Sequence, residues 1–422
     1  MKEKQKFLMV IYLVLTLLLV LYPCQAAATQ VPGEFKIGVI YSLTGGGSAV
    51  GTTQLDGAEL AVKEINERGG LNIGGILVPV QVLVRDDETK PDVAIRRYRE
   101  LTGEGVRVIV GGTFGHISTA YNVQAQDGQT FVMATNGIEE KCHRKENKAP
   151  YFLSSLGATD AVGRICADYV ARTYEPKHVI LCLPDYSYGH GANKGAMTVF
   201  EGKYPQIKVE TLWTPVGTPD FTSYILRLKD SKPDVVMMGQ WGDDAIGIVK
   251  QAHELGLHED TIVFYNSINA ALALGIPPEA VEGMAMGIWL YHDLSDFLKE
   301  KDPETVRAME ELTEVWRAEY GEPPDVMAVY AYIGMRETLR AIELAGGTDP
   351  KAMYQALMEN PEFMSVKGPA HWREDGRPFY KYAKFIGIGK GADERADRFD
   401  YAKVIDAYEG EQLVLPLIEM GY

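Results

Sequence analysis

The sequence has 422 residues, of which 46% are hydrophobic and 24% are charged. These proportions are typical of a globular protein and exclude a disordered chain, and the length suffices for two lobes rather than one core. The formal net charge of −16 gives an acidic surface that repels phosphate backbones, which argues against nucleic acid as a partner.

The first 28 residues have the order of a secretion signal. Three lysines within the first six residues precede an apolar run over 7–21, and three alanines follow at 26–28. We therefore expect residues 1–28 to be a signal peptide cleaved after Ala28, which places the mature chain in the periplasm or elsewhere outside the cytoplasm. Lipidation at Cys24 is the alternative, although Pro23 fits a lipobox poorly. A retained anchor would need about 20 apolar residues, more than this run contains.

Short apolar runs alternate with helical stripes along the rest of the chain, a rhythm typical of βαβ units and parallel sheets. The expected strands are 35–41, 78–85, 106–110, 131–133, 178–183, 209–213, 235–238, 261–265 and 284–289. The expected helices are 55–66, 91–101, 221–228, 243–255, 304–320 and 326–344, the first of them ended by Gly69 and Gly70. The rhythm occurs twice, to about residue 133 and again over 178–265, so we predict an α/β fold with two Rossmann-like lobes.

Three loops follow expected strands at the carboxyl end, where ligands bind in parallel α/β sheets. The loop 42–48 is rich in glycine, 111–119 offers hydroxyls and free amides at a helix start, and 184–189 offers tyrosines. The first loop matches neither phosphate motif: no Lys follows its glycines, and Val50 stands where the last glycine of G-x-G-x-x-G would fall. An exported domain also has no ATP or NAD pool, so we expect a solute receptor without a cofactor.

Three cysteines remain after the expected cleavage, Cys142, Cys166 and Cys182. Cys166 lies in a helical pattern and Cys182 in an apolar strand, so both are expected to be small buried side chains. A bridge between Cys142 and Cys166 stays open as an alternative, because an oxidising compartment permits it.

Two charged clusters are expected to be structural. His253 and His258 are five residues apart and lie on different sides of a helix, so no metal site is expected there. The acidic run 86–88 is interpreted as a solvated strand end. The sequence also contains no G-x-S-x-G elbow and no H-E-x-x-H motif, which disfavours the alternative of an exported hydrolase.

Five motifs together carry a family resemblance. They are IGVIYSLTGGGSAVGTTQLDGAELAVKEINERGG at 37–70, DDETKPDVAIRRYREL at 86–101, VIVGG with Ser118-Thr119 within 108–119, LPDYSYGHG at 183–191 and DFTSYILRLKDSKPDVVMMG at 220–239. With these motifs the chain resembles the substrate-binding proteins of branched-chain amino acid type ABC transporters, the Leu/Ile/Val-binding group of type I periplasmic binding proteins. The resemblance covers nearly the whole mature chain.

The resemblance implies two lobes joined by a three-segment hinge that close on a small ligand, and docking of the loaded receptor on membrane permease subunits. The crossings are expected near 153–157, 290–293 and 365–371. Lobe 1 would then comprise 34–154 plus 291–365, and lobe 2 would comprise 155–290 plus 366–422.

The resemblance also implies where the ligand binds, position by position. The matched ligand-binding residues are Ser42, Phe114, Gly115, His116, Ser118, Thr135, Tyr188, Trp241 and Asn266. The loop from Phe114 to Ser118 would hold a carboxylate. For Phe114 and Trp241, filling of the core is the alternative role.

The chain departs from the amino-acid-binding pattern where that pattern has a serine and two acids. His116 stands in place of the serine, Thr159 with Asp160 beside it in place of the first acid, and Asn266 or Ser267 in place of the second. An α-amino acid needs a carboxylate for its ammonium, because an unpaired buried charge costs several kcal/mol. The expected ligand is therefore an amino acid, with an amide, a urea-like compound or an aromatic or organic carboxylate as alternatives. A sensor that feeds a signalling partner is a further alternative.

Overall fold

The computed structural model describes residues 33–137, 139–156, 158–410 and 414–422. The expected signal peptide and Cys24 lie outside these residues. The chain from Glu34 to Tyr422 forms one compact unit. Among the described helices, none combines the length and the apolar character needed to cross a bilayer.

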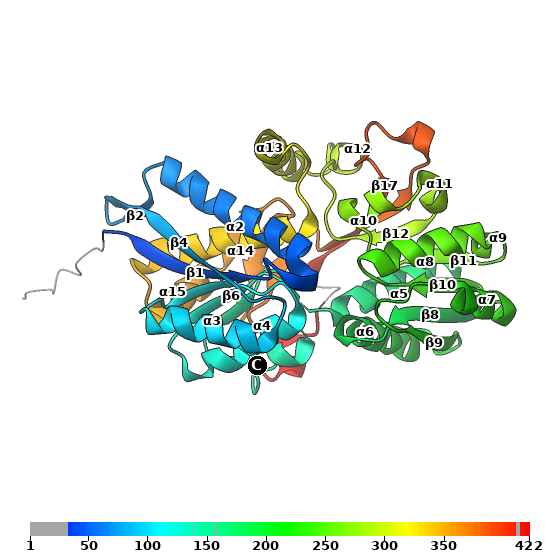
Figure 1. Cartoon of the computed structure of the whole chain (residues 1–422), viewed down its shortest axis with the longest axis horizontal. Helices are drawn as coiled ribbons and strands as arrows, with labels where there is room; N and C mark the ends of the chain where they lie inside the picture. The colour runs from blue at the N-terminus through cyan, green and yellow to red at the C-terminus, as the bar shows by residue number, and fades with distance from the viewer. Residues whose placement is uncertain (1–32, 138, 157, 411–413) are drawn as a thin grey trace, which may run out of the picture. The chain divides into compact units, whose positions relative to one another are not determined.

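The first sheet has five parallel strands in the order β4-β1-β5-β6-β7. Its strands are β1 (Phe35–Tyr41), β4 (Val80–Asp86), β5 (Val108–Gly111), β6 (Phe131–Ala134) and β7 (Phe152–Ser154). The helices around it are α2 (Ser48–Glu67), α3 (Pro91–Gly103), α4 (Gly115–Gln124), α14 (Val326–Ala345) and α15 (Pro350–Glu359). Helix α2 packs on α14 and α3 packs on α4, and Figure 1 shows helices on both faces of the sheet. A buried cluster that includes Ile40, Ile109 and Ile117 fills the space under α3 and α4.

The second sheet has seven strands in the order β17-β16-β12-β11-β10-β8-β9. Five are parallel, namely β8 (His178–Pro184), β9 (Lys208–Thr214), β10 (Val235–Met238), β11 (Ile262–Tyr265) and β12 (Ala285–Ile288). Two antiparallel strands, β16 (Lys384–Gly389) and β17 (Ala402–Tyr408), extend the edge beyond β12. The helices of this part are α5 (Asp160–Tyr174), α6 (Ser187–Lys203), α7 (Thr222–Ser231), α8 (Asp243–Glu254), α9 (Leu257–Asp260), α10 (Ala270–Gly275) and α11 (Pro278–Val281).

Smaller elements complete the described chain. They are the hairpin β2 (Leu71–Ile73) and β3 (Ile76–Val78), helices α12 (Ser295–Leu298) and α13 (Pro303–Tyr320), the antiparallel strands β13 (Glu362–Ser365), β14 (Gly368–Trp372) and β15 (Pro378–Tyr380), and the 3₁₀ turns at Gly45–Gly47, Ala125–Asp127, Glu140–His143, Ala392–Glu394 and Leu417–Met420.

The prediction of an α/β fold with two parallel sheets flanked by helices is confirmed. Each expected strand occurs with shifts of a few residues at its ends. The expected strand 78–85 is split, because Pro79 separates β3 from β4 and a proline has no N–H to donate to a ladder. The proposed bridge between Cys142 and Cys166 is wrong, since the three described cysteines are free and buried. The lobe boundaries stay predictions.

Candidate functional site

The loops after β1, β4 and β5 are tied together by Ser42, Asp87 and Thr113. Ser42 donates from its Oγ to Asp87 Oδ1 at 2.6 Å, and its N–H donates to Thr113 Oγ1 at 2.9 Å. All three side chains are fully buried. Burial raises the pKa of Asp87, while its hydrogen bonds to Ser42 and Thr89 oppose this shift. The interpretation of Asp87 as part of a solvated strand end is therefore wrong, and its place beside Ser42 was missed.

The expected carboxylate loop lies at the start of α4. Phe114 is the extended residue before the helix, Gly115 is its first residue, and the rings of Phe114 and His116 stack with centroids 5.8 Å apart. Partial desolvation lowers the pKa of the His116 imidazole, and the nearby Asp87 carboxylate raises it in part. Ser118 is buried, and its Oγ has no hydrogen-bond partner in the part of the chain that the structure describes.

Thr135 follows β6 and lies beside two other buried polar side chains. Its Oγ1 is 3.0 Å from the Tyr41 hydroxyl and 3.4 Å from Gln54 Nε2. Gln54 projects from α2, and its Oε1 has no partner. Sequence reasoning missed Gln54, because a glutamine within a helix carries no signal that it faces a strand end.

Tyr188 and Trp241 meet at the ends of β8 and β10. Their rings form an edge-to-face pair with centroids 6.0 Å apart, and both residues are half-buried. Burial raises the pKa of Tyr188 well above its usual value, and the interaction with the Trp241 side chain opposes this shift. The Tyr188 hydroxyl nevertheless makes no well-formed hydrogen bond within the described chain. Gln240 fixes the loop that carries Trp241, because its Nε2 donates to the Cys182 carbonyl at 3.2 Å.

Asn266 and Ser267 follow β11 and are both buried. The Asn266 carbonyl accepts a hydrogen bond from the Cys166 thiol at 3.4 Å, which ties this strand end to α5. Asn266 Oδ1 and Ser267 Oγ lack hydrogen-bond partners among the described residues. These two side chains therefore have free capacity to contact a ligand.

Asp160, which lies next to the position where the family has its first acid, already has two polar partners. Asp160 Oδ2 accepts the Glu140 N–H at 3.2 Å, and Asp160 Oδ1 lies 3.4 Å from Lys194 Nζ. Thr159, which stands at the matched position itself, has a buried Oγ1 without a partner. A ligand ammonium would thus meet a hydroxyl here rather than a free carboxylate.

Several buried polar atoms around the two sheets have no hydrogen-bond partner within the described chain, and three of them belong to expected site residues, namely Ser118, Tyr188 and Asn266. In a folded protein most buried polar atoms are hydrogen-bonded, so such atoms point to a bound group that completes them. On the first sheet they are Gln54 Oε1, Asp87 Oδ2, Ser118 Oγ and Tyr121 Oη, and on the second they are Thr159 Oγ1, Tyr188 Oη, Asn266 Oδ1 and Ser267 Oγ.

His253 of α8 and His258 of α9 stack on each other, with ring centroids 4.8 Å apart and nearly parallel planes. The expectation that the two histidines lie on different sides of a helix is therefore wrong, because a new helix begins between them. Within the residues described, no three His, Cys, Asp or Glu side chains lie where they could together hold a metal ion.

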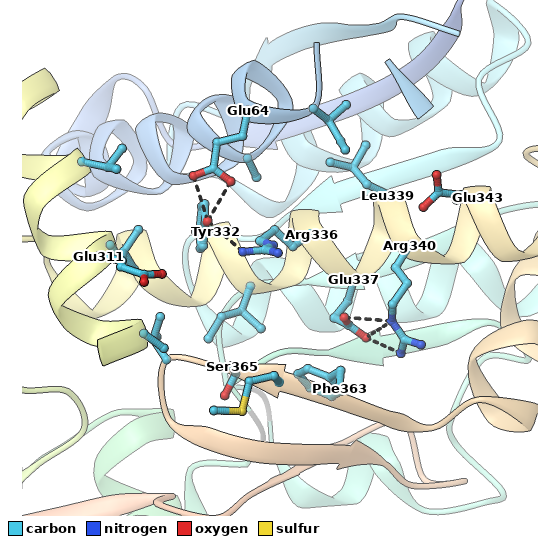
Figure 2. A pocket seen from close by; sticks show the side chains of 18 of the residues that line it. Glu64, Glu311, Tyr332, Arg336, Glu337, Leu339, Arg340, Glu343, Phe363 and Ser365 are labelled. Carbon is cyan, nitrogen blue, oxygen red and sulfur yellow. Dashed lines mark hydrogen bonds and ion pairs between the residues drawn. The ribbon is translucent and has the colours of Figure 1, made fainter. Parts of the chain in front are cut away.

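The hollow in Figure 2 lies elsewhere, among α2, α13, α14 and β13. It has a volume of about 640 Å³ and contains none of the expected ligand-binding residues. Two of its acids have polar partners within the hollow: Tyr332 donates to Glu64 at 2.8 Å, and Arg340 contacts Glu337 at 2.6 Å.

Comparison with known proteins places the chain in a family. The model of the periplasmic binding protein family matches residues 34–385, so the chain belongs to this family. The Leu/Ile/Val-binding protein BraC3 of Rhizobium johnstonii is 26% identical over 364 residues, which cover 86% of this chain and 93% of that protein.

Solved structures show the same fold. The amino acid ABC transporter substrate-binding protein of Pseudomonas fluorescens Pf-5 superposes with a TM-score of 0.80 at 20% identity, covering 92% of this chain and 99% of that one. A solute-binding protein from Rhodopseudomonas palustris BisB5, solved with 3,4-dihydroxybenzoic acid, gives 0.73 at 22% identity, covering 90% and 98%. The chain is therefore a substrate-binding protein with the type I periplasmic fold, and it is not an enzyme.

Proposed function

We propose that the chain is an extracytoplasmic solute receptor that binds a small polar ligand, a branched-chain or other amino acid, and delivers it to ABC transporter permease subunits in the membrane. The observation that carries this proposal is the set of buried polar atoms around the two sheets that lack hydrogen-bond partners within the described chain. The Leu/Ile/Val-binding relative supports the amino acid class. The N-terminal segment would direct export, followed by cleavage after Ala28 or, alternatively, by lipidation at Cys24.

The proposed ligand site combines both sheets. It comprises Ser42, Phe114, Gly115, His116, Ser118 and Thr135 from one lobe and Tyr188, Trp241 and Asn266 from the other. The ligand would dock first at the α4 loop, and hinge closure would then add the second set. Closure shifts an equilibrium between open and closed forms by the higher affinity of the closed form. The ligand leaves unchanged.

An amide, urea-like compound or aromatic or organic carboxylate is the second candidate ligand. A specific observation favours it, because Asp160 already contacts Lys194 and the Glu140 amide, while Asn266 and Ser267 replace the other expected acid. A structural neighbour holds 3,4-dihydroxybenzoic acid. A sensor that passes the signal to a partner protein would use the same site.

The direct test is a thermal-shift screen of the mature chain against amino acids, amides, urea analogues and aromatic acids. A ligand at about 100 times its dissociation constant should stabilise the fold by about 2.7 kcal/mol. Recovery of the stabilising compound by mass spectrometry checks that it is unaltered. Failure of all classes to shift the unfolding temperature, or recovery of a converted compound, would refute the receptor proposal.

A further inference from the structure

Two lysines are completely buried near the end of β12, which is unusual because the free energy of a buried ammonium is high unless an opposite charge balances it. Lys384 is the first residue of β16, and Lys367 lies in the turn between β13 and β14. Both have 0% exposed surface. Neither makes an ion pair with a described carboxylate.

The two lysines differ in the hydrogen bonds that their ammonium groups make. Lys367 donates a hydrogen bond to the Trp289 carbonyl and lies 5.4 to 6.0 Å from the ring centres of Tyr330, Tyr380 and Phe385. Lys384 lies over the Trp289 ring at 4.3 Å, but its Nζ has no hydrogen-bond partner among the described residues. Lys384 is thus the one of this pair that lacks a hydrogen-bond acceptor.

Lys384 belongs to the same cluster as the site residues of the second sheet. A Cβ placed on Gly287 would lie 2.4 Å from the Asn266 carbonyl oxygen and 3.1 Å from Lys384 Nζ, so both groups converge over that glycine. The Cys166 thiol, which donates to the same carbonyl, is close enough to influence the pKa values of both Lys384 and Tyr188. Lys384, whose ammonium has no described counter-charge, therefore lies in the same region as Asn266 and Cys166 at the end of β11.

We propose that Lys384 is a ligand-binding residue whose ammonium pairs with the carboxylate of an organic acid that carries no ammonium group. This inference rests on the proposed receptor function and narrows its ligand. The hydroxyls of Ser267 and Tyr188 can donate to the same carboxylate. A zwitterionic amino acid fits less well, because its ammonium would face Lys384 without a free carboxylate on the second sheet to receive it.

Burial and a second positive charge both destabilise the ammonium of Lys384. Burial lowers the pKa of Lys384 to about 8, so its ammonium form is destabilised by burial but still predominates at pH 7. Lys367 is close enough that its positive charge and that of Lys384 repel each other. A bound carboxylate would relieve both penalties, whereas a neutral amide of the same shape would relieve neither.

The experiment measures affinities by calorimetry for acids and their primary amides at pH 7. The probes are benzoate with benzamide, 3,4-dihydroxybenzoate with its amide, succinate with succinamide, and leucine. Wild-type protein should bind at least one acid more tightly than leucine, and at least 100-fold more tightly than its amide. In Lys384→Met this preference should fall below about 5-fold, while the amide affinity changes little.

Lys367→Met is the matched control, because it removes an equally buried lysine whose ammonium already donates to the Trp289 carbonyl. It should keep the preference for the acid within about 3-fold of wild type. Circular dichroism and thermal unfolding check that both variants are folded, and Met keeps the apolar stem of the lysine. Calorimetry at pH 8.5 in buffers of different ionisation enthalpy gives a second readout: wild type should take up protons on binding the acid, and Lys384→Met should not.

The outcomes separate the two proposals. If leucine binds most tightly and Lys384→Met leaves its affinity unchanged, or if the variant keeps the preference for the acid, the role of Lys384 is refuted while the receptor function stands. If no acid, amide or amino acid binds the wild-type protein, the receptor function itself is refuted, and this inference with it.

Discussion

Two residues of the proposed site, His116 and Tyr188, can be truncated with little expected effect on folding. His116 is exposed at the start of α4 and Tyr188 is half-buried beside Trp241, so truncation of either side chain removes little of the core. We expect His116→Ala and Tyr188→Ala each to weaken ligand binding about 10-fold or more and to change the free energy of unfolding by about 1 kcal/mol or less. Titration calorimetry and urea denaturation measure the two effects. Wild-type affinity in either variant would remove that residue from the site.

A buried histidine makes stability depend on pH. His143 is fully buried, and its Nδ1 donates to the Asp375 carbonyl at 2.9 Å. Burial, aided by the positive charge of Arg377, lowers the pKa of His143 to about 3. Between pH 6.5 and 3 the unfolded chain therefore binds a proton that the folded chain does not, so stability falls as pH falls through this window. Between pH 6 and 4 this histidine alone should cost about 2 kcal/mol.

The measurement compares urea unfolding of wild type and His143→Gln from pH 4 to pH 7. Carboxylates with lowered pKa values, such as Asp375, contribute acid sensitivity to both proteins, so the difference between them isolates the histidine. The variant should lose less stability on acidification. Parallel pH profiles would contradict the assignment.

At the scale of elements, the geometry of the loop between β5 and α4, here called the α4 loop, depends on Gly112. Gly112 has φ of +92°, and a Cβ added there would lie 2.3 Å from Ser118 Oγ. We expect Gly112→Ala to destabilise the fold by about 2 kcal/mol or more, through backbone strain and the displaced Ser118, and to reduce ligand affinity. Thermal unfolding and calorimetry measure both losses.

Gly74→Ala is the control for this loop. Gly74 also has positive φ, at +60°, but a Cβ there would meet no atom within 4 Å, and the residue lies in the turn between β2 and β3. It should therefore lose about 1 kcal/mol of stability from backbone strain alone and keep its affinity. Equal loss of affinity in the two variants would argue against a specific role of the α4 loop.

The elements that sequence reasoning found are those with a strong local pattern. β1 and β10 occur at their predicted bounds because continuous apolar runs mark buried parallel strands. Helix α6 was not predicted, since glycines at 189, 191, 195 and 202 lower its intrinsic propensity. Tertiary packing overrides this cost: a Cβ on Gly195 would lie 1.9 Å from the Asp160 carbonyl, so the glycine permits close contact between α6 and α5.

The site could be predicted only in part, because some of its residues reach it through tertiary contacts rather than through a local sequence pattern. Ser42 and Asn266 follow strands directly and Ser118 lies in the first turn of the helix after β5, so the rule that ligands bind at carboxyl strand ends suffices to nominate them. Lys384 begins an antiparallel strand and Gln54 lies within a helix, and their approach to the site depends on contacts between distant segments. Such contacts have no local signal in a single sequence.

At the scale of the whole molecule, a buried ion network joins segments from both sheets. Glu140 follows β6 of the first sheet, and its Oε2 contacts Arg164 of α5 at 2.7 Å and Arg377 at 3.6 Å. Arg377 also contacts Asp375 at 2.7 Å, and it is completely buried. The network thus connects three parts of the chain that lie far apart in sequence.

Removal of the shared acid should therefore destabilise the whole fold. Glu140→Gln leaves two buried guanidinium groups with less compensating charge, and breaking a buried pair in this way costs about 3 kcal/mol or more. Urea denaturation should show one cooperative transition at a lower midpoint. Because α5 supplies Cys166 and packs on α6, which carries Tyr188, ligand affinity should also fall.

Glu139→Gln is the neighbouring control. Glu139 pairs with Lys141 at 2.6 Å on the surface, where an ion pair contributes about 0 to 1 kcal/mol because solvent screens it. A small effect at Glu139 together with a large one at Glu140 would locate the loss in the buried network. Equally small effects would mean that Arg164 and Arg377 are satisfied without Glu140, and that the two sheets are held together by packing and the chain crossings alone.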